Sequence, residues 1–377
     1  MILEGETAYY SKYMILTDYS NIKKLYNYTT MQEIYIEDLT LGEQPYNPVE
    51  DREGKIYYII IGGTLHRNDE QLLQIDTSNL IKNPLYYDSK TDSLWLASFE
   101  SNPAGNFVNF SVFENPSAAT SNTNPSPISY EDSFSSITSC QAFAVKEDNI
   151  YIAYNNSNIL LTKKNDSSNT KASISLSNIT PALSGEVTDM AVLEDGTVAV
   201  LVNDKNLNPA NQFTLTDGCT VYSRGALVLL SSDLSTYKVY GWTDSPRTIS
   251  AKLNSDSDDP YNGASGNSQI ASITAYIPDY AERNSHFYGP MRIVAIRPKE
   301  LVIADCGANF VLPDYIGKKN GKMFTHNRLM TVNLRNFAIG CKKEFSESEL
   351  KFQYLTISGN LESVTAGWTN LSAENEK

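Results

Sequence analysis

Histidine and cysteine, on which many metal sites and nucleophilic sites depend, are scarce in this chain: 377 residues include three histidines and four cysteines. His66, His286 and His326 show neither HxH nor HExxH spacing, and no two cysteines form a CxxC pair. These absences argue against a structural zinc site and against a zinc protease. We therefore expect three ordinary surface histidines and no signature of a particular reaction.

The cysteines leave two alternatives open. If the chain works in an oxidising compartment, Cys306 and Cys341 are the expected disulfide pair, because they could lie on strands of one sheet. The other alternative is that the cysteines are buried thiols, which behave as small apolar residues.

Long apolar runs and an excess of positive charge are also missing. No run approaches the roughly 20 residues that a membrane helix needs, and the first residues lack the features of a signal peptide. A net charge of −14 argues against nucleic acid or an anionic membrane as partner. The 24 tyrosines and the many Asn, Ser and Thr residues favour an extracytoplasmic protein, periplasmic, cell-surface or secreted, whose start Met was added to a mature domain. A cytoplasmic protein is the alternative.

Helical periodicity is nearly absent, whereas short β-branched and aromatic runs are frequent, for example at 13–17, 94–99 and 198–202. The chain is therefore predicted to be all-β. Its strands recur as a unit, because residues 140–155 align without a gap on 188–203, and weaker copies occur at 84–98 and 291–305. A repeated hairpin indicates a propeller or an array.

The spacing of the copies, about 40–55 residues, predicts one β-propeller domain over 1–377 with four-stranded blades. We expect six blades, with seven as the alternative, and loop insertions near 115–136 and 252–269. Residues 227–243 and 352–369 both end in Gly-Trp-Thr, as outer hairpins of two blades would. Pairing of N-terminal and C-terminal strands in one blade would then close the ring and cover the sheet edges.

The central hairpins resemble those of NHL-type and related bacterial β-propellers. The resemblance is carried by Glu-Asp-Gly-Thr-Val-Ala-Val at 194–200, Thr-Asp-Ser-Leu-Trp-Leu-Ala-Ser at 91–98 and Lys-Glu-Leu-Val-Ile-Ala-Asp at 299–305. It implies four-stranded blades whose innermost strands line a central channel, with ligands commonly bound at one mouth.

Superposition of the hairpins predicts a set of polar side chains at one end of this channel, some at the starts of inner strands and some at the ends of their partners. The predicted ligand-binding residues are Gln141, Asp189, Arg292, Asn155, Asn203 and Asp305. The alternative is that these side chains are polar packing between blades. The same superposition predicts that Phe143 and Val145 face the same side of their blade as Ala191 and Leu193.

Two charged stretches are interpreted as loops. Residues 254–259 are rich in Asp but lack the Gly and the Glu of a calcium loop, so we expect no cofactor, with calcium as the alternative. Lys318, Lys319, Lys322 and Arg328 are expected to lie in a solvated loop.

Two functions compete. The first is a non-catalytic binding propeller that recognises a protein or a glycan through one face or through the channel mouth. The second is a channel-mouth enzyme, such as a calcium-dependent lactonase or a glycosidase, which would use carboxylates such as Asp189 and Asp305. Without a catalytic signature, the sequence favours the binding protein.

Overall fold

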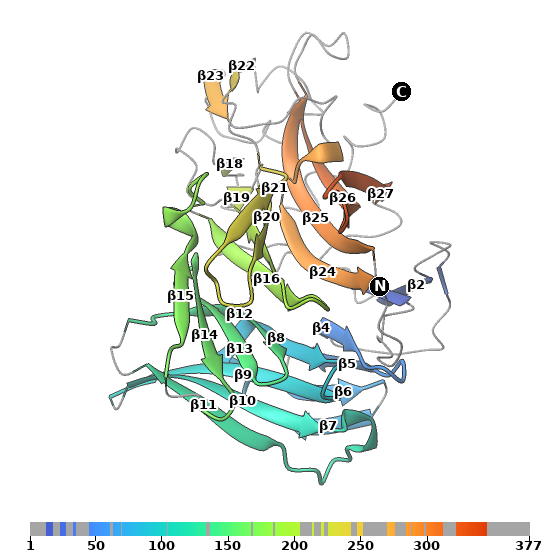
Figure 1. Cartoon of the computed structure of the whole chain (residues 1–377). Helices are drawn as coiled ribbons and strands as arrows, with labels where there is room; N and C mark the ends of the chain where they lie inside the picture. The colour runs from blue at the N-terminus through green and yellow to red at the C-terminus, as the bar shows by residue number, and fades with distance from the viewer. Residues whose placement is uncertain are drawn as a thin grey trace.

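The computed structural model is an all-β protein in which five four-stranded antiparallel sheets are arranged as propeller blades (Figure 1). The predicted fold class is confirmed at this level. The structure describes residues 13–17, 23–27, 33–34, 45–60, 63–68, 70–103, 105–132, 136–166, 169–183, 185–203, 213–214, 220–221, 225–242, 247–251, 270–275, 284–287, 289–297, 299–311 and 322–344.

Each blade is an antiparallel meander whose first strand is innermost. Blade A holds β4 (Pro45–Glu50), β5 (Ile56–Ile60), β6 (Thr64–Arg67) and β7 (Glu70–Gln74). Blade B holds β8 (Leu80–Asp88), β9 (Ser93–Asn102), β10 (Gly105–Glu114) and β11 (Ser126–Asp132). Blade C holds β12 (Cys140–Lys146), β13 (Asn149–Tyr154), β14 (Asn158–Lys163) and β15 (Ala172–Ser175). Blade D holds β16 (Glu186–Val192), β17 (Val198–Asn203), β20 (Gly225–Leu230) and β21 (Tyr237–Tyr240). Blade E holds β24 (Pro290–Arg297), β25 (Glu300–Val311), β26 (Lys322–Asn333) and β27 (Ile339–Glu344).

Smaller sheets complete the described chain. An N-terminal sheet contains β1 (Tyr13–Thr17), β2 (Lys23–Asn27) and β3 (Glu33–Ile34), and β1 lies against both β4 and β24. Two hairpins are inserted around the outer half of blade D: β18 (Phe213–Thr214) with β19 (Thr220–Val221), and β22 (Arg247–Ala251) with β23 (Ile270–Ala275). Short 3-10 helices occur at Thr77–Asn79, Pro116–Ala118 and Leu176–Asn178.

The hydrophobic core consists of apolar layers between successive blades. Blades A and B enclose one layer, for example Tyr57 against Leu94, and the layer between blades B and C includes Trp95 and Phe143. Further layers lie between C and D and between D and E. Strands of the central blades are apolar on both faces because each sheet is packed between two others.

The gapless alignment of the two best hairpins is wrong by one residue in the first strand. Four residues (146–149) lie between the paired Val145 and Ile150 of blade C, whereas five residues (193–197) lie between the equivalent pair Val192 and Val198 of blade D. Ala142 pairs with Ala153, and Asp189 pairs with Leu201, so Asp189 is the counterpart of Ala142 and not of Gln141.

This shift also overturns the prediction about faces. Phe143 and Val145 pack toward blade B, whereas Leu193 packs toward blade E. In strand β12, the residues that face blade D are Ala142 and Ala144. A shift of one residue exchanges the two faces of a strand, because side chains alternate with a period of two.

In each of the five four-stranded blades, the inner strand carries a β-bulge or irregularity near its start. The bulges include Gln141 in β12, Thr188 in β16 and Met291 in β24, where one extra residue interrupts the pairing with the second strand. In β8 the bulge is larger, because residues 81–84 lie opposite Ala97 alone. Strand β4 is irregular at residues 47–48. Since bulges re-aim side chains, this ring of bulges changes which residues reach the centre of the propeller.

Three sequence predictions need correction. The expected loop at 115–136 contains β11, the outer strand of blade B. The expected basic loop includes part of β26, in which Arg328 is buried. Strand β26 lies between the strands that carry Cys306 and Cys341. Two strand spacings of about 4.8 Å separate this pair, which exceeds the reach of a disulfide, about 7 Å between Cα atoms. The predicted loop at 252–269 lies outside the described residues.

A strap made by residues 284–287 and 289 joins blades D and E. The amide of Phe287 donates to the carbonyl of Gly241 (3.1 Å), and the amide of Gly225 donates to the carbonyl of Phe287 (3.1 Å). Phe287 is fully buried, and a Cβ at Gly241 would collide with its ring. Glycine is therefore required at position 241 for close approach as well as for its positive φ of 74°.

We expect Gly241→Ala to lower the free energy of unfolding by about 1–3 kcal/mol more than Gly196→Ala does, because only the former overpacks the core. Gly196 is the matched control: its φ is 86°, but a Cβ there would lie 3.6 Å from the nearest atom, in Ser232. Chemical denaturation of both variants measures the difference. Equal losses would mean that the strap can move away from blade D at little cost.

Candidate functional site

The side chain of Asn83 links two charged residues at the centre of the propeller. Its Nδ2 donates to Oδ1 of Asp189 (3.0 Å), and its Oδ1 accepts a hydrogen bond from the guanidinium of Arg292. Nε of Arg292 lies 3.6 Å from Oδ2 of Asp189. The amide of Ile293 donates to the same Oδ2 (2.7 Å). The structure thus brings together Asp189 and Arg292, two of the predicted site residues.

A second charged pair lies on the same strands. Lys82, next to Asn83 in the bulge of β8, forms an ion pair with Glu186 at the start of β16. Glu186 precedes Asp189 by three residues, so this pair is closer to the end at which the inner strands begin. Together Lys82, Asn83, Glu186, Asp189 and Arg292 form what we call the mouth site.

The mouth site spans the propeller axis. Strands β8, β16 and β24 belong to blades B, D and E, and Figure 1 shows their labels around the centre of the ring. Blades C and D separate B from E along the chain, so the bond between Asn83 and Arg292 crosses from one side of the ring to the other. Side chains therefore bridge the channel at the level of the bulges.

Burial and charge oppose each other at Asp189. Burial raises the pKa of its carboxyl above the usual range, while Arg292 and the N–H of Ile293 act in the opposite direction. The carboxylate oxygens each accept at least one hydrogen bond, which compensates for part of the cost of burying the charge. Asp189 thus anchors the guanidinium and the bulge of β24 to blade D.

Gln141 and Asn155 bond to chain segments of their own blade. Nε2 of Gln141 donates to the hydroxyl of Ser139 (2.9 Å), and its Oε1 accepts from the amide of Asn156 (3.1 Å). Oδ1 of Asn155 accepts from the amide of Thr138 (2.7 Å). These bonds fix the chain that leads into β12, and no contact of either side chain with Asp189 or Arg292 is recorded among the described residues.

Asn203 is the last residue of β17, and Asp305 lies in β25 where the pairing with β24 stops. Nδ2 of Asn203 contacts Sδ of Met291 (3.2 Å). Asp305 is fully buried and paired with Arg328, whose Nε lies 2.8 Å from Oδ2. Oδ1 of Asp305 also accepts from the amide of Gly289 (2.8 Å). The Asp305–Arg328 pair therefore holds the strap against blade E.

Sequence reasoning missed Lys82, Asn83 and Glu186. Strand β8 was recognised only from residue 84 onward, because the bulge breaks its alternating pattern. Pro84 was the available signal, since a proline inside a sheet is confined to edges, strand starts and bulges. Asn83, the residue before this proline, was therefore a candidate for a side chain that a bulge turns toward the propeller axis.

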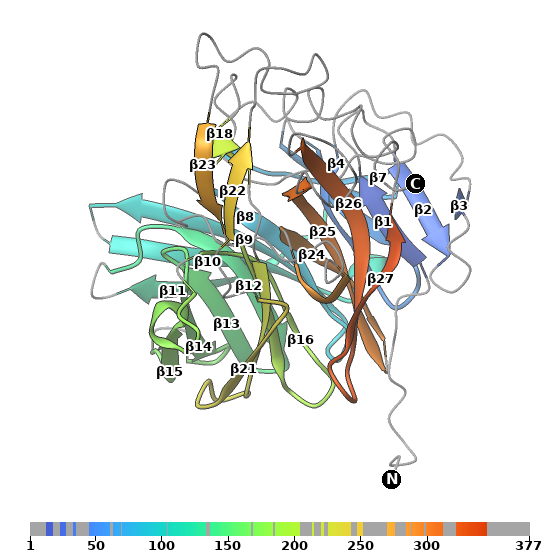
Figure 2. The same cartoon turned by 90° about the horizontal axis from the view of Figure 1, so that it is seen from above.

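The two ends of the propeller differ in their connections. At the turn end the inner hairpins close tightly, with 147–148 and 193–197 as examples. At the mouth end, where the inner strands begin, the chain inserts β18–β19 after β17 and β22–β23 after β21. Strands β25 and β26 also extend there beyond Asp305, where the pairing with β24 stops. Figure 2 shows β18, β22 and β23 above the bodies of β12, β13 and β16.

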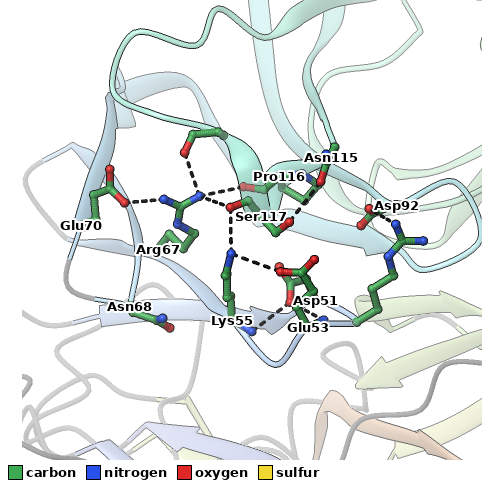
Figure 3. Close-up of polar contacts among 12 residues, drawn as sticks. Asp51, Glu53, Lys55, Arg67, Asn68, Glu70, Asp92, Asn115, Pro116 and Ser117 are labelled. Atoms are coloured by element: carbon green, nitrogen blue, oxygen red, sulfur yellow. Dashed lines mark hydrogen bonds and ion pairs between the residues drawn. The ribbon is translucent and has the colours of Figure 1, made fainter.

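Polar groups at the turn end join blades A and B. Nζ of Lys55 donates to the carbonyl of Ser117 (2.8 Å), and Arg67 donates to the carbonyls of Pro116 (3.1 Å) and Ser117 (2.7 Å), as Figure 3 shows. Arg52 pairs with Asp92. Blades C and D are joined likewise, because Nζ of Lys146 donates to the carbonyl of Leu193 (2.7 Å). These contacts are structural.

A cluster of metal-binding side chains would favour an enzyme, and an exposed aromatic patch would favour a binding protein. The described part of the chain has neither. Its side chains include no group of three or more His, Cys, Asp or Glu that could hold a metal ion. Its one exposed large hydrophobic residue is Tyr237. His66 is half-buried and stacks on Tyr58, His286 contacts Ser285, and the side chain of His326 lies outside the described part. The Asp-rich stretch at 254–259 lies outside it as well.

Comparisons with known proteins provide no family. No family model and no curated protein matches the chain. Among solved structures, a protein of unknown function from Bacteroides caccae is similar, with 11% identity and a TM-score of 0.42, over 89% of this chain and 95% of that one. A chain of the mitotic checkpoint complex has 12% identity and a TM-score of 0.38, over 92% of this chain and 87% of that one. Scores this low carry no argument about function. None of the helices in the described residues is long and apolar enough to cross a bilayer.

Proposed function

We propose that this protein is a non-catalytic binding propeller that recognises a protein or glycan ligand at the mouth end of its channel. One observation carries the proposal: three inner strands from different blades direct charged and amide side chains to one point on the axis. Placing two ion pairs and an amide there costs desolvation energy that apolar side chains would not incur. Binding sites typically combine a few placed polar groups with a rigid scaffold.

The different chain connections at the two ends of the propeller also support ligand binding at the mouth end. Tight turns and contacts between blades occupy the turn end, whereas the inserted hairpins gather at the mouth end. Loops and insertions on a rigid scaffold are the usual carriers of recognition. Among the predicted site residues, Asp189 and Arg292 are the proposed ligand contacts, together with Lys82; Gln141, Asn155, Asn203 and Asp305 support the surrounding chain.

We also propose that the N-terminal sheet is the sixth blade. Its first strand, β1, lies against both β4 and β24, which is the position that an inner strand of a closing blade would take. The C-terminal repeat at 352–369, outside the described residues, would complete this blade. The NHL-like relationship, the absence of a cofactor and an extracytoplasmic location remain proposals that accompany this account.

Replacing Arg292 with lysine tests the site. We expect the affinity for a ligand found on a glycan and protein panel to fall about tenfold or more, because lysine lacks the fork-shaped donor set of arginine. Isothermal titration of wild type and variant measures the change. The matched control is Lys299→Ala, since Lys299 is exposed at the turn of the same β24–β25 hairpin.

The pair of variants separates the outcomes. Weaker binding for Arg292→Lys with normal binding for Lys299→Ala would support recognition at the mouth end. The reverse result would place recognition at the turn end and contradict the proposal. Turnover of a panel compound that depends on Asp189 would favour the alternative, a channel-mouth enzyme.

A further inference from the structure

We infer that the mouth site binds an anion, and that the ligand presents a carboxylate to it on a small sugar acid. This inference rests on the proposed function and gives it a ligand chemistry. The observation behind it is an asymmetry within the two ion pairs. The side chain of Lys82 is 31% exposed and that of its partner Glu186 only 3%. The side chain of Arg292 is 18% exposed and that of Asp189 10%.

In both pairs the cation is therefore the more accessible partner, and the acid lies behind it in the protein. Two pairs with the same order present positive charge to whatever occupies the mouth, although the whole chain carries a net charge of −14. Fields of this kind are focused in concave, low-dielectric surroundings. An anion approaching the axis meets the cationic side chains of Lys82 and Arg292 before it meets the buried carboxylates.

The acid of β25, Asp305, does not offset this positive charge. Asp305 is fully buried with Arg328, so it adds no accessible negative charge. Ion pairs elsewhere do not share one order: in Arg67–Glu70 the acid is the more exposed partner (13% and 51%), and Lys171 and Asp166 are about equally exposed (39% and 41%). Arg52–Asp92 at the turn end has the same order as the mouth site, with 35% and 10% exposed. The mouth site differs in that two pairs with this order meet there, because both of their acids, Glu186 and Asp189, belong to strand β16.

The chemistry of the donors identifies the anion. A guanidinium matches the planar geometry of a carboxylate, and an ammonium group adds a second charge-assisted hydrogen bond. Both N–H groups of the Asn83 amide are already used, by the carbonyl of Thr188 and by Oδ1 of Asp189 (3.0 Å). Thr188 contributes a half-buried hydroxyl group at the same bulge level. This hydroxyl donates to the carbonyl of Pro290 (2.7 Å), and its oxygen can still accept a hydrogen bond from a hydroxyl group of a sugar ring. A uronate combines both features in one small molecule.

Isothermal titration with three probes tests the inference: D-galacturonate, its neutral counterpart D-galactose, and glutarate, which has carboxylates but no sugar ring. We expect galacturonate to bind at least about tenfold more tightly than galactose, because a charge-assisted hydrogen bond contributes about 1.5–3 kcal/mol. Binding should weaken when salt is raised. Glutarate should bind more weakly than galacturonate.

Two variants locate the binding. Lys82→Met should reduce galacturonate affinity about tenfold or more by the same argument. Because this change leaves Glu186 buried beside an apolar group, the double variant Lys82→Met/Glu186→Gln, which removes both charges, is measured in parallel. Lys171→Met is the matched control, since Lys171 also belongs to an ion pair and lies at the β14–β15 turn of blade C.

The outcomes distinguish this inference from the proposed function. If galactose binds as tightly as galacturonate and binding of both depends on Arg292, the mouth site still binds a ligand. The claim that it recognises an anionic group is then contradicted. If glutarate binds as tightly as galacturonate, the claim that the site recognises a sugar ring is contradicted. If no probe binds while a panel ligand still depends on Arg292, the inference alone falls. If galacturonate binds equally to wild type and to the double variant, it binds outside the mouth site and the inference falls, while the mouth-end proposal is decided by whether binding of the panel ligand depends on Arg292.

Discussion

Replacing Arg328 with leucine is expected to lower the free energy of unfolding by about 3–5 kcal/mol. The reason is that Asp305, fully buried, would remain as a carboxylate without its cation. The change also removes a hydrogen bond from the guanidinium to the carbonyl of His286 (2.6 Å), which holds the strap. Urea denaturation followed by circular dichroism measures the loss.

Arg52→Leu is the control for this prediction. Arg52 also pairs with a buried acid, Asp92, but its side chain is 35% exposed, so we expect a loss of about 1 kcal/mol or less. Similar losses for the two variants would contradict the claim that burial gives the Asp305–Arg328 pair its importance. The Asp305–Arg328 pair would then contribute no more to stability than a surface ion pair does.

Replacing Leu193 with alanine should cost about 2–5 kcal/mol, because a buried leucine leaves a cavity. Leu193 is 6% exposed and packs in the layer between blades D and E, with Leu201 and Leu227 among its surroundings. The conservative variant Leu193→Met keeps most of the volume and should cost less than about 1.5 kcal/mol. Denaturation curves of both variants give the two values.

A loss below about 0.5 kcal/mol for Leu193→Ala, the range of ordinary surface substitutions, would mean that Leu193 is not part of this layer. The face that Leu193 uses could not be assigned from the sequence. It depends on the length of the β16–β17 connection, and gapless alignment of two hairpins hides a difference of one residue: four residues lie between the paired Val145 and Ile150, and five between the paired Val192 and Val198. The alignment identified the strands but exchanged their faces.

Strand positions were the part of the fold that the sequence predicted well. The apolar run at 13–17 is β1, and the hairpins at 140–155 and 188–203 are the inner hairpins of blades C and D. Local alternation and turn residues are sufficient for such predictions. The outer strand β11 was missed because Ser, Pro and Asp dominate its segment, and only its pairing with β10 makes it a strand.

The mouth site likewise contains residues that the sequence predicted and residues that it did not. The prediction that Asp189 and Arg292 meet was based on equivalent hairpins, and the structure places them together. Asn83 and Lys82 join them from a blade on the other side of the axis, through a bulge with four residues opposite one. Contacts between residues more than 100 positions apart, such as Asn83 with Asp189, follow from ring closure and bulge geometry, which local patterns do not encode.

Hydrogen-deuterium exchange with and without a bound ligand from the panel tests the central claim, recognition at the mouth end, most directly. We predict slower exchange in peptides that cover residues 80–85, 186–190 and 290–293, because the ligand shields this end and restrains the bulges. Peptides that cover the turns at 51–55, 147–148 and 193–197 should be unchanged. Protection confined to those turns, with no change at the bulges, would contradict the account.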